Sequence, residues 1–453
     1  MITNGSKSFS HPRRGAAYVL VLGASLLVFI IGVSALAAMT VTSEGIDQLN
    51  DAQSAEQLAP SGIQWAMTKL SSNTNWRSVY SNNTYGGSIG FGGGTFKWKV
   101  RDLSDSNLAD DAGDEVQIVS QATVGDAVRT YAATYVHPNS PLELLMSNIH
   151  AGADIDIKSG ATLQLFEDDE LISANGSWKN DGRLEGNART TSLSGGGGSG
   201  TASGTVVTNA STLTMPSSAF VDRLIARATT LTYSGDIDTK LIAPGLNEYD
   251  LDAPTGSNIW YLNTGGQDIT IKNSRIQGTL IINVGNSKSV RITNRVLIEP
   301  DSPSMPSLIV IGNLEIQTDG PSLGLAALLA LPLGDLRTTL AATSKPLSES
   351  TLSHNFNPPT APYQGGSDTD KADRYPCMMN GLIYATSDVV FSNTNWVLGL
   401  VIAGQDVDVD GGTTAVFHDT IYYDNPPDGM VEYDTSTFVL MNGTWGRIGA
   451  NDE

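Results

Sequence analysis

Five aspartates crowd one short polar stretch of the sequence. The stretch lies between two segments of alternating apolar residues within 94–136, so the carboxylates belong to a loop between two predicted strands. Proteins hold Ca²⁺ with six to eight oxygen ligands, which the carboxylates of a loop can supply. The sequence therefore predicts a candidate calcium site here, and a solvated acidic loop is the alternative. The candidate ligands are Asp102, Asp105, Asp110, Asp111 and Asp114.

A second acidic motif lies near the C-terminus. Residues 406–411 read D-x-D-x-D-G, which is how a helix–loop–helix calcium loop begins. The twelfth position of such a loop takes a bidentate glutamate, and in this sequence it is Phe417. The same residues align with an apolar stretch at 388–391, eighteen positions earlier. We therefore interpret the motif as a strand with inward valines and outward aspartates.

Catalytic chemistry has little support in the residue types. Sugar-degrading β-helix enzymes need paired carboxylates or a basic residue on adjacent coils, and the long C-terminal region is poor in Lys and Arg. The sequence has no H-E-x-x-H zinc motif and no P-loop. His150, His354 and His418 stand in no recognisable catalytic context. We expect a protein that is not an enzyme and has no cofactor besides the candidate calcium.

The charge and cysteine content restrict partners and compartment. The chain carries 47 acidic and 26 basic residues among 453, for a net charge of −21. Such a surface repels phosphate backbones, so we expect no nucleic-acid partner. Cys377 is the single cysteine, so no intrachain disulfide can form.

An apolar segment near the N-terminus predicts a membrane helix. Residues 16–39 contain no charge, and at about 1.5 Å rise per residue they span about 36 Å. Of the two flanks of this segment, the N-terminal one carries basic residues and the C-terminal one carries acidic residues. The positive-inside rule then keeps residues 1–15 cytoplasmic as a leader. We expect a single-pass inner-membrane protein whose C-terminal domain is periplasmic or extracellular.

The junction of leader and helix resembles a known family of leaders. Arg13-Arg14-Gly15 followed by Ala16-Ala17-Tyr18 is similar to the start of type IV pilins and pseudopilins, and most similar to minor pilins of the PilX type. The resemblance implies cleavage between Gly15 and Ala16 by a prepilin peptidase. Most pilins carry a glutamate five residues after the cut, and Leu20 stands there in this sequence. The resemblance therefore implies a tip or accessory position instead of a shaft subunit.

Two other fates of the N-terminal helix remain open. Ala35-Leu36-Ala37 is an A-x-A pattern that signal peptidase could cleave, although the apolar run is longer than the usual signal core. The helix could also stay uncleaved as a plain anchor.

Residues 40–137 are expected to form a small α+β unit, as the pilin resemblance implies. The helix continues towards Pro60, where the missing amide donor predicts a kink or break before a second helix that ends near Leu70. Alternation at Phe96, Trp98 and Val100 predicts a strand. Two further strands are expected to turn at residues 125–126.

Residues 142–440 are expected to form a long β-array. The segment 381–391 recurs at 399–409, and shorter relatives occur at 154–157 and 268–271. Short apolar strands with a fixed period indicate a β-solenoid, or β-helix, in which each turn buries its aliphatic side chains on the next. An irregular β-sandwich is the alternative. Similar solenoid regions follow PilX-like N-termini, so the resemblance also covers this region.

Two segments are expected to interrupt the array. Residues 194–205 are rich in Gly and Ser and predict a flexible excursion. Residues 321–377 begin with an apolar stretch too short to span a membrane and continue as an insertion.

The chain as a whole is thus predicted to be mainly β with an N-terminal transmembrane helix. The expected function is non-enzymatic, as a minor pilin-like component of a type IV pilus-like or type II secretion-like assembly. The expected partners are the membrane, pilin-like or secretion-system subunits and prepilin peptidase. The alternative is a β-helix adhesin or carbohydrate-binding protein, and a polysaccharide-active β-helix enzyme is a weaker one. Trp178, Trp260, Tyr422 and Tyr423 could serve a glycan surface if exposed, or the core if buried.

Overall fold

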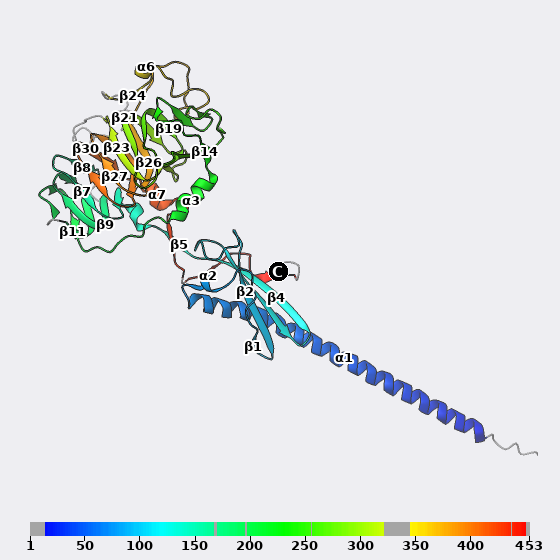
Figure 1. Cartoon of the computed structure of the whole chain (residues 1–453). Coiled ribbons are helices and arrows are strands. Elements are labelled where there is room, and N and C mark those ends of the chain that lie inside the picture. The colour runs from blue at the N-terminus through cyan, green and yellow to red at the C-terminus, as the bar shows by residue number, and fades with distance from the viewer. Residues whose placement is uncertain are drawn as a thin grey trace, which may run out of the picture. The chain divides into compact units, whose positions relative to one another are not determined.

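The computed structural model describes residues 14–166, 170–194, 197–254, 256–320, 345–435 and 437–449. The chain divides into two units (Figure 1). Unit 1 comprises Met1–Pro138 and Tyr433–Glu453, and unit 2 comprises Asn139–Glu432. The prediction of a mainly β chain with a long apolar N-terminal helix is confirmed.

Unit 1 begins with one long helix, α1 (Arg14–Ser71). Its apolar first half, up to about Val41, is exposed along its whole described length, and in Figure 1 it extends beyond the sheet of this unit. In the described part of the chain, α1 is the one helix that is long and apolar enough to cross a membrane. A helix with apolar side chains all round is suited to a membrane or to other helices, because water solvates it poorly.

The predicted break at Pro60 needs correction, because α1 continues through this residue as one helix. The second half of α1 buries one face on the sheet of unit 1, including Ala59, Ile63 and Leu70. This packing outweighs the lost amide hydrogen bond, since tertiary burial and not propensity supplies most helix stability. Gly62 permits the close approach, because a Cβ there would lie 2.1 Å from the Ser120 hydroxyl oxygen.

An antiparallel sheet covers that face of α1. Its strands are β1 (Ile89–Phe91), β2 (Gly94–Asp102), β3 (Val116–Val124) and β4 (Ala127–Val136), and the short helix α2 (Trp76–Val79) precedes them. Phe96, Trp98 and Val100 are buried together, as the alternation predicted. The predicted turn at residues 125–126 is confirmed, because Val124 pairs with Ala127.

The C-terminal segment returns to complete unit 1. The strands β32 (Val439–Leu440) and β33 (Gly446–Arg447) pair with β4. Phe438 packs against Trp76 at a ring distance of 5.9 Å. Residues 433–440, which the sequence pattern assigned to the array, therefore lie in unit 1. Unit 2 is an insertion between β4 and β32.

Unit 2 is built from three ladders of parallel strands in one 23-stranded sheet. The first ladder, in spatial order, is β14 (Thr229–Leu231), β18 (Ile259–Asn263), β20 (Thr279–Asn283), β22 (Pro306–Ile311), β26 (Met378–Ala385), β28 (Asn395–Ala403), β6 (Ile149–Ala151), β9 (Leu171–Asn180), β11 (Asn187–Leu193) and β13 (Val206–Val207).

The other two ladders share the longer strands of the first or of each other. The second contains β15 (Ile237–Asp238), β19 (Ile269–Gln277), β21 (Ser289–Glu299), β23 (Asn313–Thr318), β27 (Val389–Phe391), β29 (Val407–Val409), β7 (Ile155–Ile157) and the later parts of β9 and β11. The third contains β16 (Leu241–Ala243), the later parts of β19 and β21, the first parts of β26 and β28, then β30 (Thr413–Phe417), β8 (Thr162–Leu165), β10 (Arg183–Glu185) and β12 (Thr201–Ala202).

The two copies of the eighteen-residue repeat form neighbouring strands of these ladders. Gly381 pairs with Gly399 and Phe391 pairs with Val409, so the two copies lie in register. The relative at 154–157 continues the same ladder, because Val407 pairs with Ile155. The last ladder strands of unit 2 in the sequence thus pair with its first ones. The chain therefore enters and leaves unit 2 near the middle of the array.

Short helices cover the outer face of the first ladder. They are η1 (Glu143–Met146), α3 (Ser218–Arg227) and α7 (Ile421–Asp424). Phe220, Val221 and Leu224 of α3 are buried in this layer. The aliphatic residues inside the ladders form a separate core.

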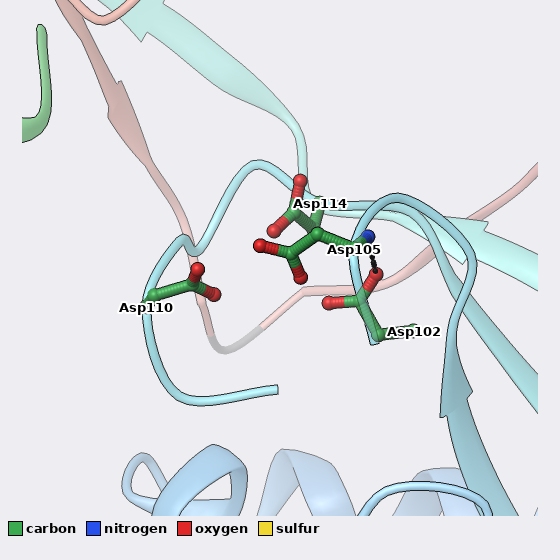
Figure 2. Close-up of side chains that lie close together, drawn as sticks. All are labelled: Asp102, Asp105, Asp110 and Asp114. Carbon is green, nitrogen blue, oxygen red and sulfur yellow. Dashed lines mark hydrogen bonds between the residues drawn. The ribbon is translucent and has the colours of Figure 1, made fainter. Parts of the chain in front are cut away.

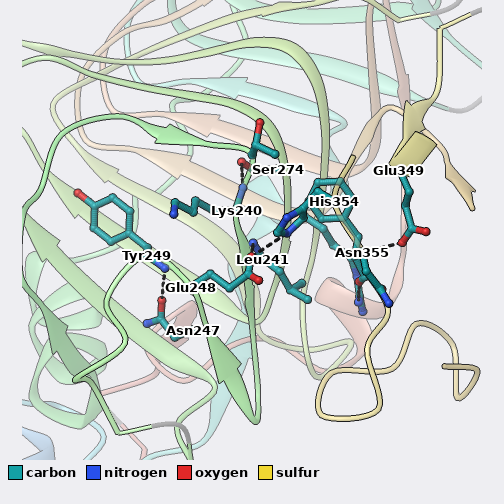
Figure 3. Close-up of polar contacts among 12 residues, drawn as sticks. Lys240, Leu241, Asn247, Glu248, Tyr249, Ser274, Glu349, His354 and Asn355 are labelled. Atoms are coloured by element: carbon teal, nitrogen blue, oxygen red, sulfur yellow. Dashed lines mark hydrogen bonds and ion pairs between the residues drawn. The ribbon is translucent and has the colours of Figure 1, made fainter. Parts of the chain in front are cut away.

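The described part of the predicted insertion, from residue 345, covers the outer face of the third ladder. It contains β24 (Leu347–Ser348), α6 (Glu349–Leu352) and β25 (Arg374–Tyr375), whereas residues 321–344 lie outside the described residues. His354 Nε2 lies 2.8 Å from Glu248 Oε2, which is shown in Figure 3. Arg275 donates to the carbonyls of Phe356 at 2.6 Å and Ala361 at 3.0 Å. The insertion is therefore held on the array by polar contacts as well as by apolar packing.

Two smaller pairings complete the described strands. The strand β17 (Leu246–Asn247) is antiparallel to β16, and β5 (Asn139–Pro141) pairs with β31 (Val431–Tyr433).

The expected excursion at residues 194–205 is wrong for its described part. Residues 201–202 form β12 and pair with β10. The glycines follow from close packing between neighbouring backbone segments, because a Cβ on Gly200 would lie 2.2 Å from the Gly182 carbonyl oxygen. The Gly-rich composition thus reflects backbone contact and not a lack of structure.

Candidate functional site

The candidate site lies in the loop that joins β2 to β3. We call residues 102–115 the acidic loop. Arg77 of α2 holds its backbone, donating to the carbonyls of Leu108 at 3.3 Å, Ala112 at 3.0 Å and Asp114 at 3.1 Å. Leu108 is buried in the core of unit 1 and anchors the middle of the loop. The loop is therefore fixed at several points, which brings its side chains to defined positions.

Four of the five predicted ligands come together in this loop. Asp102, Asp105, Asp110 and Asp114 each offer one carboxylate oxygen, and these oxygens all lie within 4.8 Å of one another (Figure 2). The fifth, Asp111, is not in the group. Its Oδ1 accepts a hydrogen bond of 2.8 Å from the Gly113 amide, which orients it within its own turn.

Asp102 is the buried member of the group. Its side chain is 3% exposed, and its Oδ1 accepts hydrogen bonds from the amides of Ser104 at 2.6 Å and Asp105 at 3.3 Å. Its Oδ2 is also buried and has no hydrogen-bond partner among the described residues. A buried carboxylate oxygen without a partner is unfavourable, because nothing replaces the water it lost.

The electrostatics of the loop reflect this crowding. Burial raises the pKa of Asp114, and the neighbouring carboxylates of Asp102, Asp111 and Asp110 raise it further, while a hydrogen bond with Ser104 opposes the shift. Burial also lowers the pKa of the Arg77 guanidinium, against the attraction of the same aspartates. The carboxylates thus repel one another in a partly dehydrated place, where a cation would be stabilised.

The second acidic motif, at residues 406–411, forms no such group. Asp406 Oδ1 accepts the Asp154 amide at 2.9 Å, and Asp408 forms an ion pair of 3.2 Å with Lys158. Val407 and Val409 are buried between these aspartates, as the strand interpretation predicted.

One acidic group that the sequence did not reveal lies in the insertion of unit 2. Glu349, Asp368 and Asp373 offer oxygens within 4.8 Å of one another. Glu349 is fully buried, but its oxygens accept hydrogen bonds from the Phe356 amide at 2.6 Å, the Tyr375 hydroxyl at 2.7 Å and the Asp373 amide at 3.2 Å. This carboxylate is satisfied locally and organises the insertion. Glu349 lies nineteen positions before Asp368, so the sequence spacing does not signal the group.

The histidines have structural surroundings. His150 is buried and lies 2.7 Å from the Ser173 hydroxyl and 3.2 Å from the Met215 sulfur. Burial lowers the pKa of His150 to about 4. His418 Nε2 lies 2.9 Å from the Leu145 carbonyl oxygen. The His150–Ser173 pair lies inside the protein, out of reach of a substrate.

A cleft of about 460 Å³ lies within unit 2, between the insertion and the array. Its polar lining includes Gln277, Glu299, Asp301, Tyr363 and Asn380. The aromatic residues considered for a glycan surface mostly lie elsewhere. Trp178, Trp260 and Tyr422 are buried, and Tyr423 is half-buried.

The predicted processing site lies at the start of α1. The helix begins at Arg14, so Gly15 and Ala16 fall in its first turn, and residues 1–13 of the predicted leader lie outside the described residues.

Comparison with known proteins adds little. No family model matches the sequence. No curated protein matches it. Among solved structures, the competence-associated pilin ComZ from Thermus thermophilus matches with 12% identity, covering 88% of this chain and 97% of that chain at a TM-score of 0.27. This TM-score is too low for the alignment to carry an argument about fold or function.

Proposed function

We propose that this chain is a non-enzymatic, single-pass inner-membrane protein and a minor pilin-like component of a type IV pilus-like or type II secretion-like assembly. The observation that carries the proposal is the difference between the two halves of α1. Its first half is apolar and exposed, and its second half packs on an antiparallel sheet. A bilayer, or the helices of neighbouring subunits, would cover the exposed half.

The leader supports the same proposal. Arg14 and Gly15 precede the apolar run, as in the prepilin leaders that they resemble, and a prepilin peptidase would cut before Ala16. Leu20 stands where most pilins carry a glutamate, which favours a tip or accessory position. The basic leader would stay cytoplasmic, and the sheet of unit 1 and all of unit 2 would lie on the other side of the membrane.

We further infer that the three ladders of unit 2 form a β-solenoid displayed by the pilin-like unit. Strands of all three ladders follow one another along the chain, and each pairs in parallel with its counterpart in the next turn. Such stacking gives a rigid surface from short repeats. The solenoid would be carried as an insertion between β4 and β32.

The test is mass spectrometry of the mature N-terminus of protein from native membranes. A mature chain that starts at Ala16 is expected, together with co-purification of pilin-like or secretion-system subunits. Gly15→Val should block processing, whereas Gly23→Val is the matched control because a Cβ on Gly23 meets nothing within 4 Å. An intact Met1, or a start near Ala38, would refute the pilin-like assignment.

A second candidate function is carbohydrate binding, which the cleft of unit 2 favours. Its amides and carboxylates could hydrogen-bond sugar hydroxyls, and the half-buried Tyr363 ring could stack on a sugar face. Titration with neutral oligosaccharides tests it. Saturable binding that Gln277→Ala weakens would support the adhesin alternative, and its absence across a glycan array would reject it.

A further inference from the structure

The geometry points to a Ca²⁺ site formed by Asp102, Asp105, Asp110 and Asp114 of the acidic loop. Two oxygens that each lie about 2.4 Å from one Ca²⁺ can be at most about 4.8 Å apart. All pairs of the four nearest carboxylate oxygens meet this limit. One ion can therefore contact all four side chains with little movement of the loop.

The buried oxygen of Asp102 is the independent reason to expect a ligand. The local backbone satisfies its Oδ1, but its Oδ2 has no partner among the described residues although the side chain is 97% buried. Figure 2 shows this carboxylate directed towards those of Asp105 and Asp114. The nearby Arg77 directs its Nη donors to backbone carbonyls. A bound cation would supply the missing partner of Asp102.

The donor set selects the class of ion. All four ligands are hard oxygen donors, without the nitrogen or sulfur that zinc and softer metals favour. Asp105 and Asp110 are exposed, so water can complete the six to eight ligands of Ca²⁺. Mg²⁺ demands a tighter octahedron at about 2.1 Å and gives up its water reluctantly. The site should therefore prefer Ca²⁺, with an affinity of about 10⁻⁴ to 10⁻³ M, as in extracellular modules.

The position of the site suggests what the ion stabilises. Gly113 of the acidic loop packs under Tyr433, because a Cβ on Gly113 would lie 2.3 Å from the Tyr433 hydroxyl oxygen. Tyr433 is the first residue of the segment that returns to complete unit 1. Ca²⁺ would thus fix the loop on which the returning segment rests.

The first experiment is calorimetric titration of the full chain in detergent with CaCl₂, and with MgCl₂ for comparison. Saturable calcium binding is expected. Asp110→Asn should weaken calcium binding at least tenfold, because it removes one charged ligand. The variant should still fold, because the Asp110 side chain is exposed and makes no described hydrogen bond. Asp126→Asn, an exposed aspartate in the β3–β4 turn, is the matched control and should bind as the unchanged chain does. Equal affinity in Asp110→Asn and the unchanged chain would overturn the site.

The second experiment places the ion beside Tyr433. Tb³⁺ replaces Ca²⁺ at oxygen sites, and its luminescence is sensitised by nearby aromatic side chains. Excitation of tyrosine should give a Tb³⁺ signal that CaCl₂ displaces, that Tyr433→Phe reduces and that Asp102→Asn abolishes. A displaceable signal that persists in Asp102→Asn would place the ion elsewhere and reject the site. The site does not depend on the proposed function, since calcium binding can fail while the mature chain still starts at Ala16.

Discussion

A set of aspartates in unit 2 differs from the aspartates of the acidic loop in unit 1. In unit 2, an aspartate directly precedes several strands of the second ladder, and its Oδ1 accepts a backbone amide at or just before a neighbouring strand. We call these the corner aspartates. They are Asp154, Asp236, Asp268, Asp388 and Asp406, with acceptor distances of 2.5 to 3.3 Å. In the acidic loop of unit 1, by contrast, the Asp102 Oδ2 has no partner among the described residues.

Asp268 and Asp250 of unit 2 also differ from Asp114 of the acidic loop in the direction of their pKa shifts. The Ser289 amide holds the pKa of Asp268 below its usual value, and the Thr232 amide does the same for Asp250. In the acidic loop, burial raises the pKa of Asp114. An acidic cluster therefore suggests a cation site only where the backbone leaves its oxygens unsatisfied, and sequence composition does not distinguish the two situations.

The largest expected effect is a difference between the two units in how stability depends on pH. Because burial lowers the folded-state pKa of His150 to about 4, the unfolded chain binds the proton more tightly. The contribution to stability is present above pH 6.5 and is lost as the pH falls towards 4, which for unit 2 amounts to about 3 kcal/mol. Scanning calorimetry of the full chain between pH 7 and 4 measures it. His150→Gln should flatten this dependence, and an unchanged slope in that variant would contradict the assignment.

Unit 1 should respond less over the same range. Burial lowers the pKa of His137, so its contribution is lost as the pH falls below about 6.5. Asp114 acts in the opposite direction, because its raised pKa favours the folded state as the pH falls through that value. These two shifts oppose each other in calcium-free buffer.

The next effect concerns Arg77, whose guanidinium holds the backbone of the acidic loop. Arg77→Met should destabilise unit 1 by about 2 kcal/mol, because three carbonyls lose a donor and the aspartates lose a nearby positive charge. Arg291→Met is the control in unit 2. Its ion pair with Glu315, 2.7 Å long, is partly exposed and should contribute less than about 1 kcal/mol. Denaturant unfolding of both variants gives the comparison, and equal losses would contradict it.

Replacing aspartate by alanine should change stability in opposite directions at Asp406 and at Asp110. Asp406→Ala removes the acceptor of the Asp154 amide and should destabilise unit 2 by about 1 kcal/mol, whereas Asp406→Asn keeps an acceptor and should be nearly neutral. Asp110→Ala in a chelator should relieve repulsion and raise the melting temperature of unit 1 by about one degree. In saturating calcium the same variant should melt lower than the unchanged chain. A drop without calcium would show that Asp110 is structural.

The sequence predicted local features better than long-range ones. The apolar helix, the strand at 94–102 and the register of the eighteen-residue repeat depend on neighbouring residues, and all are present. The pairing of β32 with β4 joins residues about 300 positions apart through a two-residue strand, for which no periodicity exists. The stacking of β28 on β6 was equally hidden, because similar turns of a repeat are interchangeable in sequence.

The acidic loop shows the same limit on a smaller scale. Residue type and loop position identified four carboxylates that the structure brings together, but they could not exclude Asp111. In the structure the Asp111 Oδ1 accepts a hydrogen bond from the Gly113 amide within its own turn. The buried state of Asp102 depends on the packing of the whole unit, which no local pattern encodes.

The smallest expected effect uses Cys377 to ask whether calcium acts on unit 1 alone. The thiol is fully buried in unit 2, and burial raises its pKa to about 11, so a thiol reagent can react only when the array opens. If Ca²⁺ binds the acidic loop and stabilises only unit 1, the labelling rate of Cys377 should change less than about twofold between chelator and saturating calcium. Asp406→Ala should accelerate labelling about fivefold, which proves that the assay detects opening of the array. If calcium slowed the labelling of Cys377 more than tenfold, the ion would stabilise unit 2 as well. The effect of calcium would then not be confined to the unit that holds the acidic loop.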